Sequence, residues 1–230
     1  MQISERLKTV ACAVKSGGTV ADVGCDHAFT SIYMIENGIA DHVIATDIGR
    51  LPLMRAKEHV TEFGLTDMIE TRLSDGLVEI GPDEVDTVLI SGMGGALMAR
   101  ILDDGQAVIG GISELVLSPQ SEIFLVRSFL NEHCFVIDRE YMIFEQGKYY
   151  VVIHAVPGNE PKLGRAEQLY GRRLIQEKNP VLKSFLEIEL CRIEGVLNKL
   201  KADGMSYVAE VRRQQLYDER EMVEQVLGLF

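Results

Sequence analysis

Short β-branched runs alternate with helix-like segments between residues 18 and 131, and no other feature constrains the fold of this chain as strongly. Five strands are expected, at Thr19–Val23, His42–Thr46, Ile69–Leu73, Thr87–Ser91 and Glu114–Leu117. Helices are expected after the first, second, fourth and fifth of these strands, at Ala28–Asn37, Leu51–Phe63, Gly94–Asp103 and Glu122–Asn131. This alternation indicates βαβ units, and therefore an α/β fold with a parallel sheet.

Two further β-like runs, Phe135–Phe144 and Tyr149–Val156, are joined by the short segment from Glu145 to Lys148. Their pattern predicts an antiparallel hairpin that closes one edge of the sheet. Five alternating strands followed by a hairpin is the order of a Rossmann-like class I methyltransferase core. A dehydrogenase that binds a dinucleotide usually continues with further βα units instead.

The segment Pro157-Gly158-Asn159-Glu160-Pro161 breaks regular structure and predicts a boundary between a core domain, residues 1–157, and a helical C-terminal domain, residues 158–230. In the second domain, an apolar seam at a/d spacing is formed by Leu186, Leu190, Ile193, Leu197 and Leu200. Gly204 is expected to end that helix. A last helix, from about Ser206 to Leu227, repeats apolar residues every seven positions, at Leu216, Val223 and Phe230. The expected result is an antiparallel, coiled-coil-like helical pair.

The composition favours a globular protein in a reducing compartment. No stretch approaches the roughly 18 apolar residues that a membrane helix needs. At the N-terminus, the spacing of Leu7, Val10, Ala11 and Val14 predicts an amphipathic helix rather than a signal peptide. The four cysteines are scattered, without CxxC or a Cys/His pair at zinc spacing, so we expect neither disulfides nor a metal site. We therefore expect a cytoplasmic protein, with a monomer as the working assumption.

The net charge of −12 is unevenly distributed. Residues 1–157 hold 11 Lys and Arg against 23 Asp and Glu, whereas residues 158–230 hold 12 of each kind. Because phosphate neutralisation supplies most nonspecific affinity for nucleic acids, the acidic whole argues against such binding. If RNA binds, the basic residues of the C-terminal part are expected to provide much of the affinity.

The first strand leads into the turn Asp22-Val23-Gly24-Cys25-Asp26-His27, and a helix follows directly. Such a turn brings backbone amides and a helix N-terminus close to a ligand. In a methyltransferase, Asp22 and Gly24 would hold the amino acid end of the cofactor, with Asp22 either accepting from the ammonium group or lying one layer behind. Asp26 stands where the generic pattern has glycine, and Asp tolerates left-handed backbone better than most residues. The alternative is a tight βα turn without a ligand.

Acidic residues also follow the second and third strands. Asp47 lies 23 residues after Gly24, where an acid can accept hydrogen bonds from both ribose hydroxyls of NAD or S-adenosylmethionine. Ser74-Asp75-Gly76 follows the third strand, where Asp75 would accept from the exocyclic amine of adenine. The alternatives are a helix N-cap for Asp47 and a bare turn for residues 74–76.

Ser91-Gly92-Met93-Gly94-Gly95 follows the fourth strand, and its three glycines let the backbone lie close to a ligand. In class I enzymes, Gly92, Met93 and Gly94 would lie where the methyl donor meets its acceptor. The chain lacks the Asn/Asp/Ser-Pro-Pro-aromatic motif with which many enzymes grip an amino group of a base. A ring nitrogen with a free lone pair needs no such grip, so the pattern favours a ring nitrogen as acceptor.

These motifs in this order, together with Ser118-Pro119-Gln120 and Glu145-Gln146-Gly147-Lys148-Tyr149-Tyr150, resemble the TrmK family of bacterial tRNA (adenine-22-N1)-methyltransferases. The resemblance covers the whole chain in layout and is specific over residues 1–155. It implies S-adenosylmethionine as the cofactor and tRNA as the substrate, methylated at N1 of adenosine 22. Two positions depart from the family: Ser118-Pro119-Gln120 stands where Gln-Pro-Asn is usual, and Cys25 replaces a small hydroxyl residue.

The chemistry implied by this resemblance is attack of adenine N1 on the methyl group of the cofactor. N1 carries a free lone pair near neutral pH, so positioning is expected to dominate catalysis. The product ring is cationic, and a nearby carboxylate would stabilise it. Asp26 is the candidate, with His27 as the second; the alternatives are a helix N-cap for Asp26 and a structural role for His27. Arg6 matches a family position near the cofactor carboxylate, or else forms a surface salt bridge.

Arginines of the helical domain are the candidates for RNA binding. Arg165, Arg172 and Arg173 lie with Lys178 on one predicted helix, and Arg212 and Arg213 lie on another. They either grip phosphate groups or form an ordinary solvated face. Two other functions stay open at this point: a class I methyltransferase that acts on a small molecule or protein, and a Rossmann-like module that binds a nucleotide without catalysis.

Overall fold

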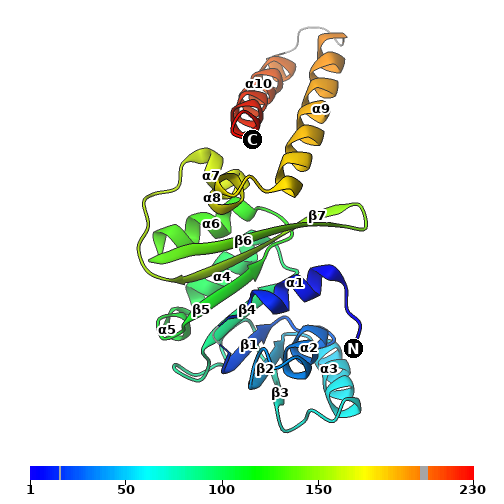
Figure 1. Ribbon diagram of the computed structural model, residues 1–230, viewed down its shortest axis with the longest axis vertical. Coiled ribbons are helices and arrows are strands. Elements are labelled where there is room, and N and C mark those ends of the chain that lie inside the picture. Colours follow the sequence, from blue (N-terminus) through cyan, green and yellow to red (C-terminus); the bar gives the residue numbers. More distant parts are fainter. Residues whose placement is uncertain (16, 203–206) are drawn as a thin grey trace. The chain divides into compact units, whose positions relative to one another are not determined.

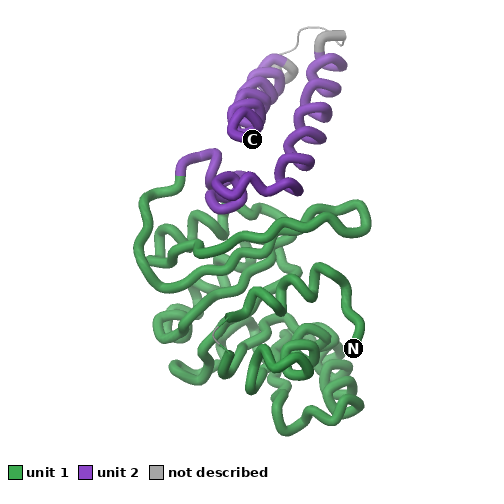
Figure 2. Tube along the Cα trace, viewed as in Figure 1, with its two compact units in different colours: residues 1–163 green, residues 164–230 purple. Residues whose placement is uncertain are grey.

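The computed structural model describes residues 1–15, 17–202 and 207–230. The chain divides into two compact units, residues 1–163 and residues 164–230 (Figure 2). No helix formed by the described residues is both long and apolar enough to span a membrane. The motifs after the predicted strands all belong to the first unit, so this unit positions the candidate site.

Seven strands of the first unit form one sheet in the order β3-β2-β1-β4-β5-β7-β6 (Figure 1). Their bounds are β1 Thr19–Val23, β2 His42–Asp47, β3 Ile69–Leu73, β4 Thr87–Ser91, β5 Glu114–Ser118, β6 Phe135–Glu145 and β7 Lys148–Pro157. The first five strands are parallel, and the β6–β7 hairpin joins β5 through β7 in the antiparallel direction. This order confirms the predicted class I methyltransferase core, including its terminal hairpin.

The helices of the first unit are α1 Glu5–Ala13, α2 Phe29–Glu36, α3 Arg50–Glu62, α4 Gly95–Asp104, α5 Gln106–Ile109 and α6 Ile123–Glu132. Helices α1 and α2 lie on one face of the sheet, and α4 and α6, which contact each other, lie on the other face (Figure 1). The central strands are buried along almost their whole length, as expected for parallel strands covered on both faces. The predicted bounds agree with the observed ones to within one residue. Only α5, four residues long, is too short to give a periodic pattern.

A buried polar group fixes the end of α1 against the sheet. Glu114, at the start of β5, accepts a hydrogen bond of 2.9 Å from the backbone N–H of Lys15, which follows α1. The same carboxylate accepts from the hydroxyl of Thr87 on β4 and lies 2.6 Å from Nε2 of His154 on β7. A buried carboxylate with partners from three other segments is well compensated, so α1 has a defined place over the sheet.

The segment that follows β7 remains attached to the first unit. Glu160 accepts a hydrogen bond of 3.1 Å from the backbone N–H of Ile137, and the N–H of Leu163 donates to the side chain of Asn131 at 3.1 Å. The side chain of Leu163 is also buried. The division between the units therefore falls after Leu163, whereas the breaker residues alone place it at Pro157.

The second unit is helical, with α7 Arg165–Tyr170, α8 Arg172–Gln176, α9 Pro180–Ala202 and α10 Tyr207–Leu227. Helices α9 and α10 contact each other and run in opposite directions (Figure 1), which confirms the predicted helical pair. Buried apolar residues of this pair include Leu182, Leu186, Ile193, Leu197, Leu216, Val223 and Val226. Leu190 and Leu200 of the predicted seam are only half-buried, and Gly204 and Ser206 lie outside the described residues.

One prediction for this unit is wrong. The single helix expected from Arg165 to Lys178 is in fact two short helices, α7 and α8, separated by Gly171. Gly171 has a φ of +90°, which side chains rarely permit, and this conformation interrupts the helix. Arg165 therefore lies on a different helix from Arg172 and Arg173.

Candidate active site

A cavity of about 270 Å³ lies at the carboxyl ends of β1 and β4. Its lining comes from α1, the turn between β1 and α2, the end of β4 and the loop after β5, and consists of Arg6, Leu7, Asp22, Gly24, Cys25, Asp26, His27, Phe29, Thr30, Ser91, Gly92 and Gln120. The structure thus brings together five of the residues predicted from the sequence, Asp22, Gly24, Asp26, His27 and Gly92.

The turn after β1 uses left-handed backbone at three positions. Gly24, Asp26 and Ala28 have φ angles of +75°, +49° and +58°. The N–H of Gly24 donates a hydrogen bond of 2.8 Å to the carbonyl of Thr46 on β2, which fixes the turn to the neighbouring strand. The N-cap of α2 is Ala28, so the alternative in which Asp26 caps this helix is wrong. The Asp26 carboxylate is therefore not needed as the cap of α2.

Asp22 lies at the buried floor of the cavity. The hydroxyl of Ser31 donates to its Oδ2 at 2.6 Å, and only 4% of Asp22 is exposed. Burial raises the pKa of Asp22 to about 6; the hydrogen bond from Ser31 opposes this rise, and the charge of Asp47 adds to it. The carboxylate is thus ionised at neutral pH in surroundings that favour a nearby positive charge.

Arg6 supplies a cation to the same cavity. Its Nη1 lies 3.3 Å from the hydroxyl of Ser91 at the end of β4, and its guanidinium carbon lies 5.4 Å from the ring centroid of Tyr150 on β7. Both contacts hold the side chain of the first turn of α1 over the ends of the strands. Of the two roles considered from the sequence, the structure supports the one inside the site.

Asp47 joins the turns after β1 and β2. Its Oδ1 accepts from the N–H of Gly49 at 2.8 Å, and its Oδ2 accepts from the N–H of Asp26 at 3.2 Å. The N-cap of α3 is Gly49, so Asp47 is not the cap itself. Each carboxylate oxygen has a second lone pair, which leaves acceptor capacity for ligand hydroxyl groups.

The turn after β3 is not part of this cavity. Ser74 is buried, and its hydroxyl donates to the carbonyl of Gly76 at 2.9 Å and accepts from the N–H of Glu79 at 3.2 Å. Asp75 is exposed and lines a separate small cavity of about 50 Å³ beside Arg100. The contacts of Ser74 are those of a turn, and the predicted cofactor contacts of Ser74, Asp75 and Gly76 stay predictions.

The glycine-rich loop after β4 lies against the turn after β1. A Cβ on Gly24 would collide with the Cε methyl of Met93, so the Met93 side chain lies directly over this glycine. Gly92 has a φ of +87°, and Gly94 is the N-cap of α4. The φ of +75° at Gly24, which side chains rarely permit, and the Met93 methyl over this residue together favour glycine at position 24.

His27 lies in an aromatic cluster at the rim of the cavity. Its ring stacks on Phe29, with centroids 5.5 Å apart, and Phe29 stacks on His59 of α3 at 4.8 Å. Nδ1 of His59 lies 3.0 Å from the carbonyl of His27, so this nitrogen is the donor. Nδ1 of His27 is buried without a hydrogen-bond partner, and its Nε2 lies 3.7 Å from Oδ1 of Asp26. Aromatic contacts and the proximity of Asp26 thus hold the His27 ring at the rim of the cavity.

Gln120 is a site residue that the sequence analysis recorded only as part of a departure from the family pattern. Its backbone N–H donates to the carbonyl of Met93 at 2.9 Å, and it lines the cavity next to Gly92. Ser118 is buried at the end of β5. The loop Ser118-Pro119-Gln120 therefore brings a carboxamide to the cavity, and its position after β5 is the signal that identifies it.

The predicted RNA-binding arginines differ in their surroundings. Arg172 is buried, and its guanidinium makes two hydrogen bonds with Glu167, at 2.8 and 3.0 Å, which hold the pKa of Glu167 below its usual range. Arg173 donates to Gln176 at 3.2 Å. These contacts, the first between α8 and α7 and the second within α8, stabilise the helices.

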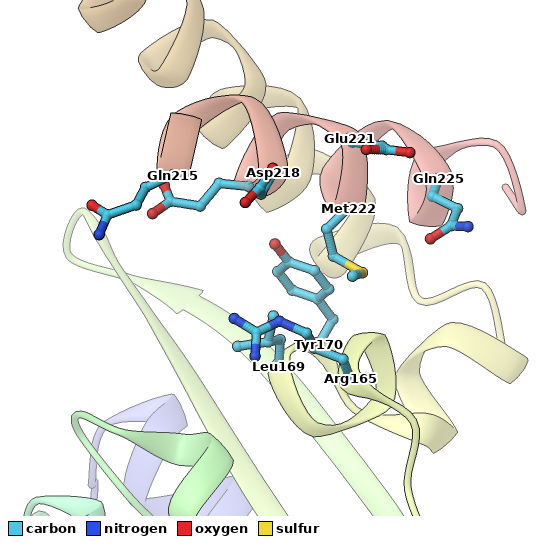
Figure 3. A pocket seen from close by; sticks show the side chains of 9 residues that line it. Arg165, Leu169, Tyr170, Gln215, Asp218, Glu221, Met222 and Gln225 are labelled. Carbon is cyan, nitrogen blue, oxygen red and sulfur yellow. The ribbon is translucent and has the colours of Figure 1, made fainter. Parts of the chain in front are cut away.

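Arg165 and Arg212 are the more exposed of the set. Arg165 lines a cavity of the second unit together with Tyr170 and acidic residues of α10, among them Asp218 (Figure 3). Arg212 lies 3.6 Å from Glu219, and Arg213 pairs with Glu210. The five arginines do not share one uncompensated patch, and their binding of RNA stays a prediction.

Within one cavity, Asp22 provides an anion and Arg6 provides a cation, and the backbone of Gly24 and Gly92 lies at the ends of β1 and β4. This combination suits a ligand that carries both an ammonium and a carboxylate group, and Asp47 beside it offers acceptors for hydroxyl groups. The turns at Gly24 and Gly92 and the side chain of Gln120 complete the lining around these charged groups. Together with the strand order, these features define a class I methyltransferase that uses S-adenosylmethionine.

Comparisons with known proteins agree with this class. Residues 3–153 match the family model described as a methyltransferase domain. The chain is 31% identical over 232 residues to the tRNA (adenine(22)-N(1))-methyltransferase of Bacillus subtilis (strain 168), covering 99% of this chain and 98% of that protein. The crystal structure of the B. subtilis tRNA methyltransferase TrmK matches with a TM-score of 0.88 at 31% identity, covering 98% of this chain and 99% of that one.

A second solved structure adds the cofactor. M. capricolum TrmK in complex with the cofactor product S-adenosylhomocysteine matches with a TM-score of 0.86 at 27% identity, covering 100% of this chain and 99% of that one. The chain belongs to the TrmK family of tRNA (adenine-22-N1)-methyltransferases. The resemblance seen in the sequence motifs is thereby confirmed.

Proposed function

We propose that this protein transfers the methyl group of S-adenosylmethionine to N1 of adenosine 22 in tRNA. The observation that carries the proposal is the similarity to the B. subtilis tRNA (adenine(22)-N(1))-methyltransferase, which extends over both units of the chain. The cavity in the first unit supports it, because its charged groups and glycine turns suit this cofactor.

In this proposal, Asp22 and Arg6 hold the amino acid end of the cofactor. Asp22 accepts from the ammonium group, which offsets the cost of keeping a buried carboxylate ionised. Arg6 pairs with the carboxylate, its position set by Ser91 and Tyr150. Asp47 accepts from the ribose hydroxyls with the lone pairs that Gly49 and Asp26 do not use.

The remaining cofactor contacts come from the loops after β3 and β4. We assign Asp75, with Ser74 and Gly76 shaping its turn, to the adenine of the cofactor. Gly92, Met93 and Gly94 would border the place where donor and acceptor meet, because they adjoin both Gly24 and the loop of Gln120. S-adenosylmethionine, when bound, supplies a methyl group on a cationic sulfur.

The residues of the site then have two tasks in the reaction. The first is positioning: adenine N1 has a free lone pair at neutral pH and needs no general base, so the alignment of N1 with the methyl group limits the rate. We assign Gln120 to the orientation of the base through its carboxamide. The second task is electrostatic, since the methylated ring is cationic and the Asp26 carboxylate would stabilise it. His27, 3.7 Å from Asp26, would orient that carboxylate.

Substrate RNA is expected to reach the second unit as well. In this proposal, exposed arginines of this unit, Arg165 and Arg212, bind phosphate groups of the tRNA. Arg213 would assist, whereas Arg172 and Arg173 contribute mainly to helix packing.

The test is to incubate the protein with an unmodified tRNA transcript and S-adenosylmethionine that carries a labelled methyl group, and then to digest the RNA to nucleosides. The expected product is labelled 1-methyladenosine. Label in 6-methyladenosine would contradict the choice of a ring nitrogen. Methylation of other acceptors but not of tRNA would favour a small-molecule or protein substrate. Binding of the cofactor with no transfer to any acceptor would favour a module without catalysis.

A further inference from the structure

The β6–β7 hairpin extends well past the rest of the sheet. Strand β7 pairs with β5 through Leu115↔Ala155, Val116↔His154 and Leu117↔Ile153, so the part from Lys148 to Val152 continues beyond that pairing. Because β7 is antiparallel to β5, this free part points toward the carboxyl edge of the parallel strands. The hairpin tip therefore projects on the side of the sheet edge where the cofactor cavity lies (Figure 1).

The tip carries a pair of aromatic rings. Phe144 and Tyr149 are direct cross-strand partners, and their ring centroids lie 4.7 Å apart with planes tilted by 44°. Phe144 is 57% exposed, whereas Phe135, at the other end of β6, is only 5% exposed. An exposed ring on an extended hairpin contributes little to the stability of the first unit. A role in binding is therefore the better explanation for an aromatic side chain at this position.

Contacts with α1 fix the tip relative to the cavity. The carboxylate of Glu145 accepts a hydrogen bond of 2.7 Å from the backbone N–H of Glu5, in the first turn of α1. The ring of Tyr150 lies under Arg6, which lines the cavity. The hairpin is thus hydrogen-bonded to, and packed against, the same helical turn that brings Arg6 to the cofactor site.

Phe144 and the half-buried Tyr149 face the other way. Successive side chains of a strand alternate between the faces of the sheet, so Tyr149 and its partner Phe144 point away from the α1 face to which Tyr150 points. That opposite face carries α4 and α6, whose first residues follow the glycine-rich loop and the Gln120 loop. The pair therefore lies on the same face of the sheet as the two helices that begin at the loops that we assign to the acceptor base.

We propose that Phe144, supported by Tyr149, is a stacking platform for an unpaired nucleobase of the tRNA next to the target adenosine. This inference rests on the proposed function. An adenine can present N1 to a buried cofactor only after leaving its helical stack, and its neighbours then lose a stacking partner. Aromatic side chains commonly replace such a stacking partner.

The natural chain contains no tryptophan, which allows a direct test. Phe144→Trp introduces a single fluorophore at the tip, and binding of unmodified tRNA should quench its emission, because a stacked base quenches indole fluorescence. The matched control is Phe63→Trp, which replaces a phenylalanine of similar chemistry that is 37% exposed at the C-terminal end of α3. The same quenching in both variants, or none in Phe144→Trp while tRNA is bound, would overturn the proposal. Emission of free Phe144→Trp that shifts with protein concentration would also overturn it, since a second copy of the chain would then cover the ring.

Kinetics provide the second measurement. Phe144→Leu keeps the apolar character but removes the aromatic face, and should lower kcat/KM for tRNA about tenfold. Phe144→Tyr should retain the wild-type value, and both variants should bind S-adenosylmethionine as the wild type does, because Phe144 does not line the cavity. Equal kcat/KM for Phe144→Leu and wild type would overturn the platform while leaving the proposed function intact. Failure of the wild type itself to methylate tRNA would instead overturn the proposed function.

Discussion

The hydroxyl of Ser31 donates a hydrogen bond of 2.6 Å to Oδ2 of Asp22, and both side chains are buried. This bond favours the ionised carboxylate, yet burial outweighs it and raises the pKa of Asp22 to about 6. The cofactor-free protein therefore holds a buried negative charge at neutral pH at an energetic cost. A bound ammonium group would offset that cost, which makes Asp22 the most specific electrostatic feature of the site.

The affinity for S-adenosylmethionine should depend on this ionisation. Asp22 is charged above a pH of about 6 and loses its charge below it, so affinity should fall as the pH is lowered from 7.5 to 5. Asp22→Asn should bind the cofactor weakly and with little change over this range. Calorimetric titration at several pH values measures both effects.

The thermal stability of the cofactor-free Asp22→Asn variant provides the control. The pKa of Asp22 in the folded protein is raised above the ordinary value of 3.8, so its ionisation costs stability as the pH rises from about 4 to about 6. The variant removes that cost and should melt at least as high as the wild type at pH 7.5. Wild-type affinity that stays constant from pH 5 to 7.5 would contradict the role of Asp22.

Asp47→Ala should also weaken cofactor binding. The variant loses the acceptors for two ribose hydroxyls, each worth roughly 0.5–1.5 kcal/mol. It also loses the hydrogen bonds from Gly49 and Asp26 that join the two turns. The cofactor affinity of Asp47→Asn, which keeps one acceptor oxygen, should lie between those of the wild type and Asp47→Ala. An unchanged dissociation constant for Asp47→Ala would mean that this residue only braces the turn.

Asp26 is expected to act in the chemical step. Asp26→Asn should lower the single-turnover rate at saturating tRNA and cofactor roughly tenfold or more, which corresponds to about 1.4 kcal/mol per decade. Cofactor affinity should change little, since Asn retains the polar shape and tolerates the φ of +49°. Asp41→Asn, at an exposed position before β2, is the matched control. Equal rates for Asp26→Asn and wild type would leave positioning by the backbone as the better account.

The arginines of the second unit should separate into two groups. Arg165→Ala and Arg212→Ala should weaken tRNA binding and reduce its dependence on salt, because each phosphate contact contributes roughly one unit to the slope of log affinity against log salt. Arg172→Met should instead destabilise the unit, because it leaves Glu167 without its bidentate partner. Filter binding across a salt series, with thermal melting in parallel, distinguishes them. An unchanged salt slope for the first two variants would remove them from the RNA-binding set.

The sequence predicts most of this fold because its signals are local. Strand runs such as Thr87–Ser91 and the hairpin follow directly from periodicity, and the parallel sheet follows from the alternation of strands and helices. The helix break at Gly171 cannot be predicted from the sequence. A glycine within a helical pattern is compatible with an uninterrupted helix, and the sequence does not show that its φ is +90°. The bounds of the first unit likewise depend on Glu160 and Leu163, whose contacts are with residues distant in sequence.

Site residues that come from single motifs could also be predicted, as the turn from Asp22 to His27 illustrates. The cation at Arg6 is different, since its place depends on contacts with Ser91 and Tyr150 that no spacing reveals. The same holds for the Met93 side chain over Gly24, which joins two loops 69 residues apart. Long-range packing decides these relationships, and only the folded structure displays them.

The central claim is methylation of one ring nitrogen at one position of tRNA. Methyl groups at N1 block the pairing edge of adenine, so reverse transcription of the treated tRNA should stop next to the modified nucleotide. The account predicts a new stop that marks position 22, absent when the protein or S-adenosylmethionine is omitted and absent with a transcript that carries guanosine at this position. A stop at another position, or transfer that persists with the guanosine transcript, would contradict it.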